Sequence, residues 1–279
     1  MISRVLIALA ALSAGCSLIR SAKRTKPTAA DSTVVADSLV FVAPEIQTYR
    51  KLGPYRESYP RQTDLMHTLL RVRFDWEKRR LYGQARLTLR PYFYPTDSVV
   101  LDAKHMLIHK VERVSGERKI ADLKYVYDDQ KLRVKLDTVF DRHQTYELFI
   151  EYTARPEEGQ QGGSRVIASN KGLYFINADG SDPDKPRQIW TQGETESSSR
   201  WFPTIDAPNE RTSQEIYITV EPEYVTLSNG VLVSQTQNPD GTRTDYWRLD
   251  APHAPYLFMM AVGRFVIVRD RWRGIDVDY

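Results

Sequence analysis

The stretch of this sequence best suited to chemistry places an amide and a carboxylate two residues apart. Gln192 and Glu194 lie in the segment Thr191-Gln192-Gly193-Glu194, and a polar and aromatic segment, residues 200–209, follows closely. This sequence is too irregular for core packing and too rich in polar side chains for a spacer. A partly desolvated carboxylate beside an amide can hold a cationic amine through charge-assisted hydrogen bonds. We therefore predict that it forms part of a binding site.

The competing interpretation is a solvated turn, in which Glu194, Glu196 and the serines Ser197 to Ser199 simply face water. These serines have no nearby histidine with an obvious acidic partner. The sequence also lacks a Gly-x-Ser-x-Gly nucleophile motif and a phosphate-binding glycine loop. We therefore assign no catalytic residue to this chain.

Alternating apolar and polar residues predict the elements that position the segment. Half-buried strands with one wet face are expected at residues 70–74, 85–89, 132–136 and 148–152. Strand patterns resume at 215–220 and 224–233, the latter with a turn or bulge signal at 228–230. Turn signals fall at short intervals, at 82–83, 95–97, 115–116 and 128–129. This spacing predicts an all-β fold, an antiparallel β-sandwich.

Two segments next to the motif are less regular. Residues 155–190 have Gly-Gly, Asp-Gly and Asp-Pro clusters and few apolar pairs, so we expect a long loop that leads into the motif. Residues 256–262 form an apolar run that ends at Gly263. This run predicts either a strand buried on both faces or a short segment that crosses the sandwich.

The N-terminus follows the pattern of a secretory signal peptide over residues 1–15. Arg4 provides the positive start, residues 5–12 are apolar, and small residues lead to Cys16. Eight apolar residues cannot span a bilayer that needs about 20. The order Ala14-Gly15-Cys16 resembles a bacterial lipobox, although Leu12 lies one residue too early. We predict lipidation of Cys16 and membrane anchoring in the bacterial cell envelope, the alternative being a plain cleaved signal.

The remaining sequence predicts a tether and one domain. Residues 16–59 are rich in Ser, Thr, Ala, Lys and Pro, as expected of a partly disordered tether, and residues 60–279 form the β-rich domain. Cys16 is the only cysteine, so no internal disulfide can form. The formal charge of +3, or +2 without Arg4 (38 basic minus 36 acidic residues), gives no indication of nucleic-acid binding.

The whole motif resembles a known family. T-Q-x-E, an Arg six residues after the Glu, and W-F-P-x-x-D-x-P-N resemble the N-terminal domain of the zinc aminopeptidases related to aminopeptidase N. Ser199, Thr204 and Ala207 depart from the Ala, Cys and Glu usual in that family. Further similar segments follow the family's order over about residues 60–279.

The resemblance implies that Gln192 and Glu194 bind the N-terminus of a peptide substrate, whose α-amine has a pKa of about 7.7–8.0. It implies zinc in the full-length protein, held by an H-E-x-x-H helix, and a segment of the G-A-M-E-N type, both absent here. We therefore expect the catalytic zinc domain of the same polypeptide beyond residue 279, and an inactive, metal-free chain by itself. We expect Asp206 to shape a turn by bonding backbone amides, and Arg200 to order the loop by pairing with a carboxylate.

The histidines provide no substitute metal site. His105 and His109 are four residues apart in a strand pattern, a distance of about 13 Å at about 3.3 Å per residue, too far for one ion. The alternative function is a non-catalytic envelope lipoprotein that uses the β-sandwich as a binding or scaffold module. Composition does not separate the two hypotheses.

Overall fold

The structure of the chain is a computed structural model, and it describes Glu57 and residues 60–158 and 170–279. They belong to one compact unit, Arg56–Tyr279. The predicted signal peptide 1–15, Cys16 and all of the predicted tether 16–59 except Glu57 lie outside the described residues. Within the described part, no helix is long and apolar enough to cross a membrane.

The described chain is built almost entirely from β-strands, with two single-turn 3₁₀ helices, η1 (Ser198–Arg200) and η2 (Pro255–Leu257). The strands are β1 (Thr63–Asp75), β2 (Arg80–Pro91), β3 (Thr96–Asp102), β4 (Met106–Ser115), β5 (Arg118–Asp122), β6 (Lys124–Tyr127), β7 (Lys131–Phe140), β8 (Tyr146–Ala154), β9 (Leu173–Ile176), β10 (Gln188–Thr191), β11 (Thr212–Val220), β12 (Val225–Ser228), β13 (Val231–Gln237), β14 (Arg243–His253), β15 (Met260–Gly263), β16 (Arg269–Trp272) and β17 (Ile275–Asp278).

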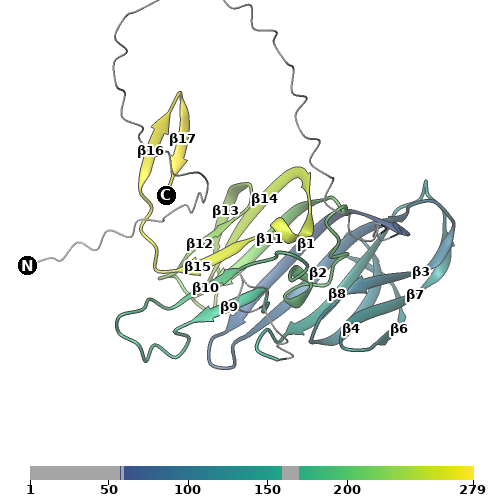
Figure 1. Cartoon of the computed structure of the whole chain (residues 1–279), viewed down its shortest axis with the longest axis horizontal. Coiled ribbons are helices and arrows are strands. Elements are labelled where there is room, and N and C mark those ends of the chain that lie inside the picture. The colour runs from purple at the N-terminus through teal and green to yellow at the C-terminus, as the bar shows by residue number, and fades with distance from the viewer. Residues whose placement is uncertain (1–56, 58–59, 159–169) are drawn as a thin grey trace, which may run out of the picture. The chain divides into compact units, whose positions relative to one another are not determined.

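The largest layer is an eight-stranded sheet in the order β13-β14-β11-β1-β2-β8-β4-β5 (Figure 1). Its neighbours are antiparallel except for the parallel pair β1 and β11. Smaller sheets have the orders β12-β15-β10-β9, β3-β7-β6 and β16-β17. The predicted all-β, sandwich-like antiparallel fold is confirmed.

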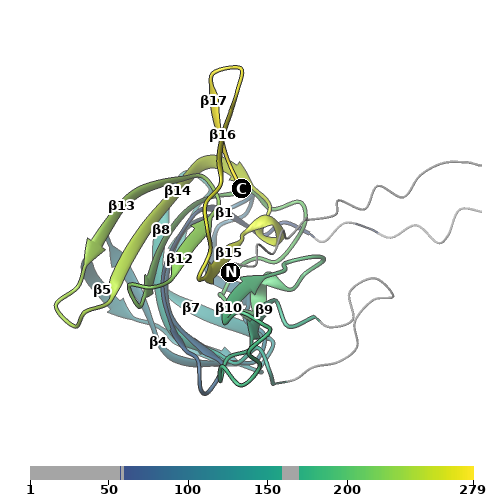
Figure 2. The same cartoon turned by 90° about the vertical axis from the view of Figure 1, so that its left-hand side faces the viewer.

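Side-chain alternation explains which face of the large sheet is buried. On β1, Leu70 and Val72 are buried while Arg71 and Arg73 are exposed, as the period of two requires. Figure 2 shows β9, β10 and β15 on the concave side of the curved large sheet. Aromatic rings join the two layers there, because Phe175 of β9 lies 5.9 Å from Trp76, the residue that follows β1. The buried faces thus form one continuous core.

The expected turn at residues 82–83 is wrong. The chain turns at residues 76–79, and Gly83 lies inside β2. A Cβ at Gly83 would lie 2.2 Å from the Tyr152 ring. This glycine therefore makes room for a buried aromatic side chain on the neighbouring strand, a requirement that local sequence does not reveal.

The long loop expected at residues 155–190 also needs correction. Its described part contains β9 and β10, which pair with each other and, through β10, with β15. These strands are only four residues long, too short for a clear alternation pattern. The apolar run 256–262 divides between η2 and β15, so only its second half is a strand.

Candidate functional site

Gln192 and Glu194 directly follow β10, an inner strand of the four-stranded sheet. The Gln192 amide donates to the Gly172 carbonyl at 2.9 Å, which continues the β9–β10 pairing one residue past the strand. The chain then leaves the sheet, so that Gln192 is half-buried and Glu194 is exposed. The sheet thus fixes the base of the segment, while the carboxylate faces solvent.

The structure brings the two predicted binding residues together. The Gln192 Nε2 atom lies 3.5 Å from Glu194 Oε2, at the long limit of a hydrogen bond. Within the described residues, the Glu194 carboxylate has no other hydrogen bond and no ion pair, so its acceptor capacity is available to a ligand. The peptide bond between Glu194 and Thr195 is cis.

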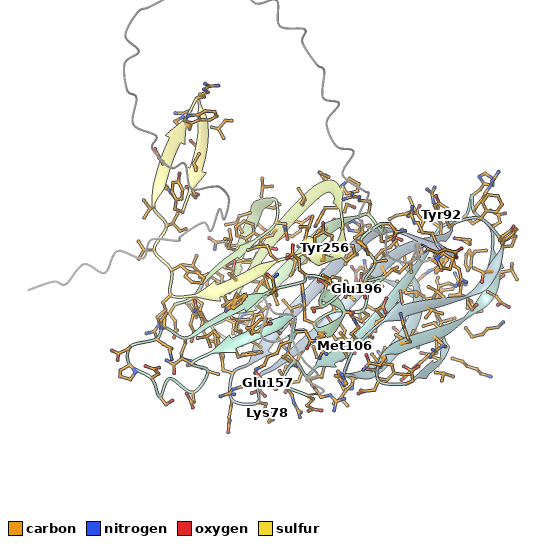
Figure 3. The ribbon with its side chains drawn as sticks, viewed as in Figure 1. Lys78, Tyr92, Met106, Glu157, Glu196 and Tyr256 are labelled. Atoms are coloured by element: carbon orange, nitrogen blue, oxygen red, sulfur yellow. The ribbon has the colours of Figure 1, made fainter. Side chains whose placement is uncertain are left out.

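Gly193, between these two residues, is buried against a second segment. A Cβ at Gly193 would lie 2.2 Å from the Tyr256 carbonyl oxygen and 2.5 Å from Ser198 Oγ. Figure 3 labels one residue from each side of this contact, Glu196 on the motif side and Tyr256 in η2. Only a residue without a side chain allows the two backbones to approach so closely.

The η2 segment is itself held by the 228–230 turn predicted from the sequence. The Asn229 side chain donates from Nδ2 to the Leu257 carbonyl at 3.0 Å and accepts the Met259 amide at 2.7 Å. The Ser228 hydroxyl donates to the Met259 carbonyl at 2.7 Å. The sequence indicated a turn here but not this clamp, which satisfies backbone groups 28–31 residues away.

The serines after Glu194 do not face water, so the solvated-turn interpretation is wrong for them. Ser197, Ser198 and Ser199 are all buried. The Ser198 hydroxyl donates to the Pro255 carbonyl at 2.8 Å. This hydrogen bond is a second contact between the motif and η2, in addition to that of Gly193 with Tyr256. The Pro255 carbonyl thus takes the place of water as the hydrogen-bond partner of the buried Ser198 hydroxyl.

Asp206 organises the far end of the motif. Its Oδ2 atom accepts the Ser199 amide at 2.9 Å and the Ser199 hydroxyl at 2.7 Å. The prediction that Asp206 bonds a backbone amide is therefore confirmed. Burial raises the pKa of the Asp206 carboxyl to about 6, although the two bonds from Ser199 act in the opposite direction.

Lys104 connects the motif to the turn between β3 and β4. Its ammonium donates to the Glu196 carbonyl at 2.6 Å, and its amide donates to the Ser199 carbonyl at 2.7 Å. Asp102, two residues earlier, accepts the Asp206 amide through Oδ2 at 3.1 Å. Sequence reasoning missed Lys104 and Asp102, because nothing local links them to residues about 100 positions away.

Arg200 lies in η1 and is buried. Burial lowers the pKa of its guanidinium. Its predicted pairing with a carboxylate stays a prediction. Thr191, the first residue of the motif, is positioned through its hydroxyl, which accepts the Met260 amide at 3.0 Å.

His105 and His109 each contact a different residue, 24 and 44 positions away in the sequence. His105 Nδ1 lies 2.6 Å from Asp129 Oδ2, and His109 Nε2 lies 2.8 Å from Thr153 Oγ1. Among the described residues, no group of three or more His, Cys, Asp or Glu side chains could hold a metal ion. The described donor set therefore does not fit zinc, whose sites use three or four such ligands.

Comparison with known proteins gives consistent matches. A family model described as the peptidase M1 N-terminal domain matches residues 55–257. A variant of the M1 zinc metallopeptidase from Deinococcus radiodurans, bound to a Tyr-Ser-Ala substrate, shares the fold with a TM-score of 0.62 at 18% identity over 78% of this chain. Aminopeptidase A from Legionella pneumophila, in complex with aspartic acid, gives a TM-score of 0.62 at 20% identity over 82% of this chain.

A protein that is not named as a peptidase also matches. Transcription initiation factor TFIID subunit 2 from Danio rerio is 24% identical over 245 residues, which is 76% of this chain. The chain spans 20% of that relative, 47% of the Deinococcus chain and 24% of the Legionella chain. Each of these proteins is therefore much longer than the matching part.

Proposed function

The chain belongs to the peptidase M1 family through its N-terminal domain, and we propose that it is the substrate-binding N-terminal domain of an exported zinc metallo-aminopeptidase. The enzyme removes N-terminal residues from peptides, and its catalytic domain lies beyond residue 279. Two similar solved structures support this proposal, an M1 zinc metallopeptidase and an aminopeptidase A. The matching part covers only 47% and 24% of their chains, so both extend well beyond it.

The observation that carries the proposal is the exposed Glu194 carboxylate, which has no ion pair with any described residue and contacts only the Gln192 side chain. Glu194 accepts the charged α-amine of the peptide, and the Gln192 amide beside it provides a further polar contact. Gly193, packed on η2, fixes the backbone between them. Preorganisation of this kind reduces the ordering cost of binding.

Zinc is assigned to the longer protein, because the described residues provide no ligand set for it. When bound there, it supplies an activated water for peptide hydrolysis. This chain's own contribution is the recognition and positioning of the substrate's amine end.

The test is Glu194→Ala in the full-length gene product, assayed on peptides with a free N-terminus. Loss of a charge-assisted contact at an exposed carboxylate should raise KM about tenfold. Glu196→Ala is the matched control, because Glu196 lies in the same turn but contributes its backbone carbonyl to Lys104. An active enzyme whose kinetics on free peptides are unchanged by Glu194→Ala would contradict this role.

The second candidate function is a non-catalytic envelope lipoprotein with the β-sandwich as a binding or scaffold module. Its support is that this domain is also similar to a transcription initiation factor subunit. In both candidates we propose export and a lipid anchor at Cys16. Immunoblotting of membrane fractions compares the native product with the 32.2 kDa of this chain. A band more than twice as heavy supports the enzyme, and a band at or slightly below 32.2 kDa supports the scaffold.

A further inference from the structure

The eight-stranded sheet has an outer face that turns away from the core and holds a cavity of about 420 Å³. Strand register places its polar lining in two rows across β1, β2 and β8. One row is Arg71, Gln84 and Glu151, and the other is Arg73, Tyr82 and Thr153. Because neighbouring strands lie about 4.8 Å apart, the side chains of both rows border one shallow space.

Most charged residues on this outer face are already paired. Arg86 contacts Glu117 at 2.9 Å, Arg90 contacts Asp64 at 2.8 Å, and Arg248 contacts Asp250 at 2.6 Å. Arg71 and Arg73 differ, because neither side chain has a hydrogen bond or an ion pair with a described residue, although the charge of Arg71 acts on Glu117. Both border the cavity.

The two unpaired guanidinium groups are held in place by aromatic rings. The Cζ atom of Arg71 lies 4.2 Å from the ring centre of Tyr217, and that of Arg73 lies 4.7 Å from the ring centre of Tyr82. A guanidinium stacked on a ring keeps its N–H groups free in the plane, where they can bind a carboxylate or phosphate in a bidentate manner. Stacking also restricts side chains that would otherwise be mobile.

We propose that this cavity binds a small ligand through one carboxylate or phosphate group, held by Arg71 and Arg73. Tyr82, Gln84 and Thr153 border the same space with further polar groups. Glu151 lies on the other side of the cavity. Its side chain has no hydrogen bond or ion pair with a described residue, and it repels a second anionic group. The ligand therefore has a single oxyanion, and the rest of it is neutral or cationic.

The test is titration of the full chain with acetate and, separately, with inorganic phosphate, followed by NMR at the backbone amides of Gln84 and Thr153. Saturable shifts with at least one anion are expected. Arg71→Gln and Arg73→Gln should each weaken binding about tenfold, because each removes one charge-assisted pair. Glu151→Gln should strengthen it, since a repulsive charge is lost.

Arg248→Gln is the matched control, because it removes the same charge from the same face but outside the cavity. It should leave the affinity unchanged. The proposal is overturned by shifts that do not saturate with either anion. It is equally overturned if Arg248→Gln weakens binding as much as Arg73→Gln does, since the effect would then be general screening.

Discussion

Asp206→Asn tests whether a buried carboxyl supports the binding loop as the geometry indicates. Burial raises the pKa of Asp206 from 3.8 to about 6. Between these values the folded chain keeps a proton that the unfolded chain releases. The stabilisation from this proton is therefore complete below about pH 4 and is lost as the pH rises through 6.

The magnitude follows from the size of the shift. A change of about two pKa units corresponds to about 3 kcal/mol of unfolding free energy. Asparagine is neutral at every pH, and its side-chain oxygen can still accept both bonds from Ser199. The unfolding free energy of the variant minus that of the wild type should therefore rise by about 3 kcal/mol between pH 4 and pH 7.5.

Urea denaturation at the two pH values measures this difference, in which the titration of all other groups cancels. Asp179→Asn is the matched control, because Asp179 accepts the same two kinds of bond from Ser181 at an exposed site. Those bonds lower the pKa of Asp179, so this control should show no such rise. A difference for Asp206→Asn that stays constant within about 0.5 kcal/mol would refute the reasoning.

Two further substitutions test the support of the loop. Gly193→Ala should destabilise the chain by about 2–3 kcal/mol, because a backbone carbonyl occupies the position of the new methyl group; an unfolding free energy within about 0.5 kcal/mol of wild type would contradict this contact. Asn229→Ala should cost about 1–3 kcal/mol through its two bonds to the η2 segment, and amide hydrogen exchange at Met259 should accelerate. Unchanged exchange there would show that Asn229 does not hold this segment.

Alternation predicted segments of the long strands β1, β2, β7 and β8 but not the long strands β4 and β14. In β2 and β8 the buried residues recur at every second position over nine or more residues, and in β1 and β7 they do so over residues 68–72 and 132–136. Such a pattern is local, because one face of each strand meets the core and the other meets water. The short strands β9 and β10 have no such length, and they exist because distant β15 pairs with β10.

Within the candidate site, the sequence identified the Glu194 carboxylate and the Gln192 side-chain amide. It did not identify the residues that fix their loop. Gln192 and Glu194 were predicted from residue type and spacing, and the structure places them in contact. Their roles in recognising an amine stay predictions. Lys104 and Asn229, which fix the loop and its support, have no sequence signal because both bind backbone carbonyls far along the chain.

The sequence by itself determined the all-β class, because alternation is local to each strand. It also determined the family and the residues of the motif, because residue types and their spacing along the chain are enough to recognise them. Tertiary structure alone decided that Gly193 lies against Tyr256 and that the serines are buried. It also decided that the side chains of Arg71 and Arg73, which have no ion pair among the described residues, border one cavity together with Glu151. These features arise where segments distant in sequence pack together. Their physical cause is that the packing of one segment sets how much room a side chain of another has and which charged groups lie near it.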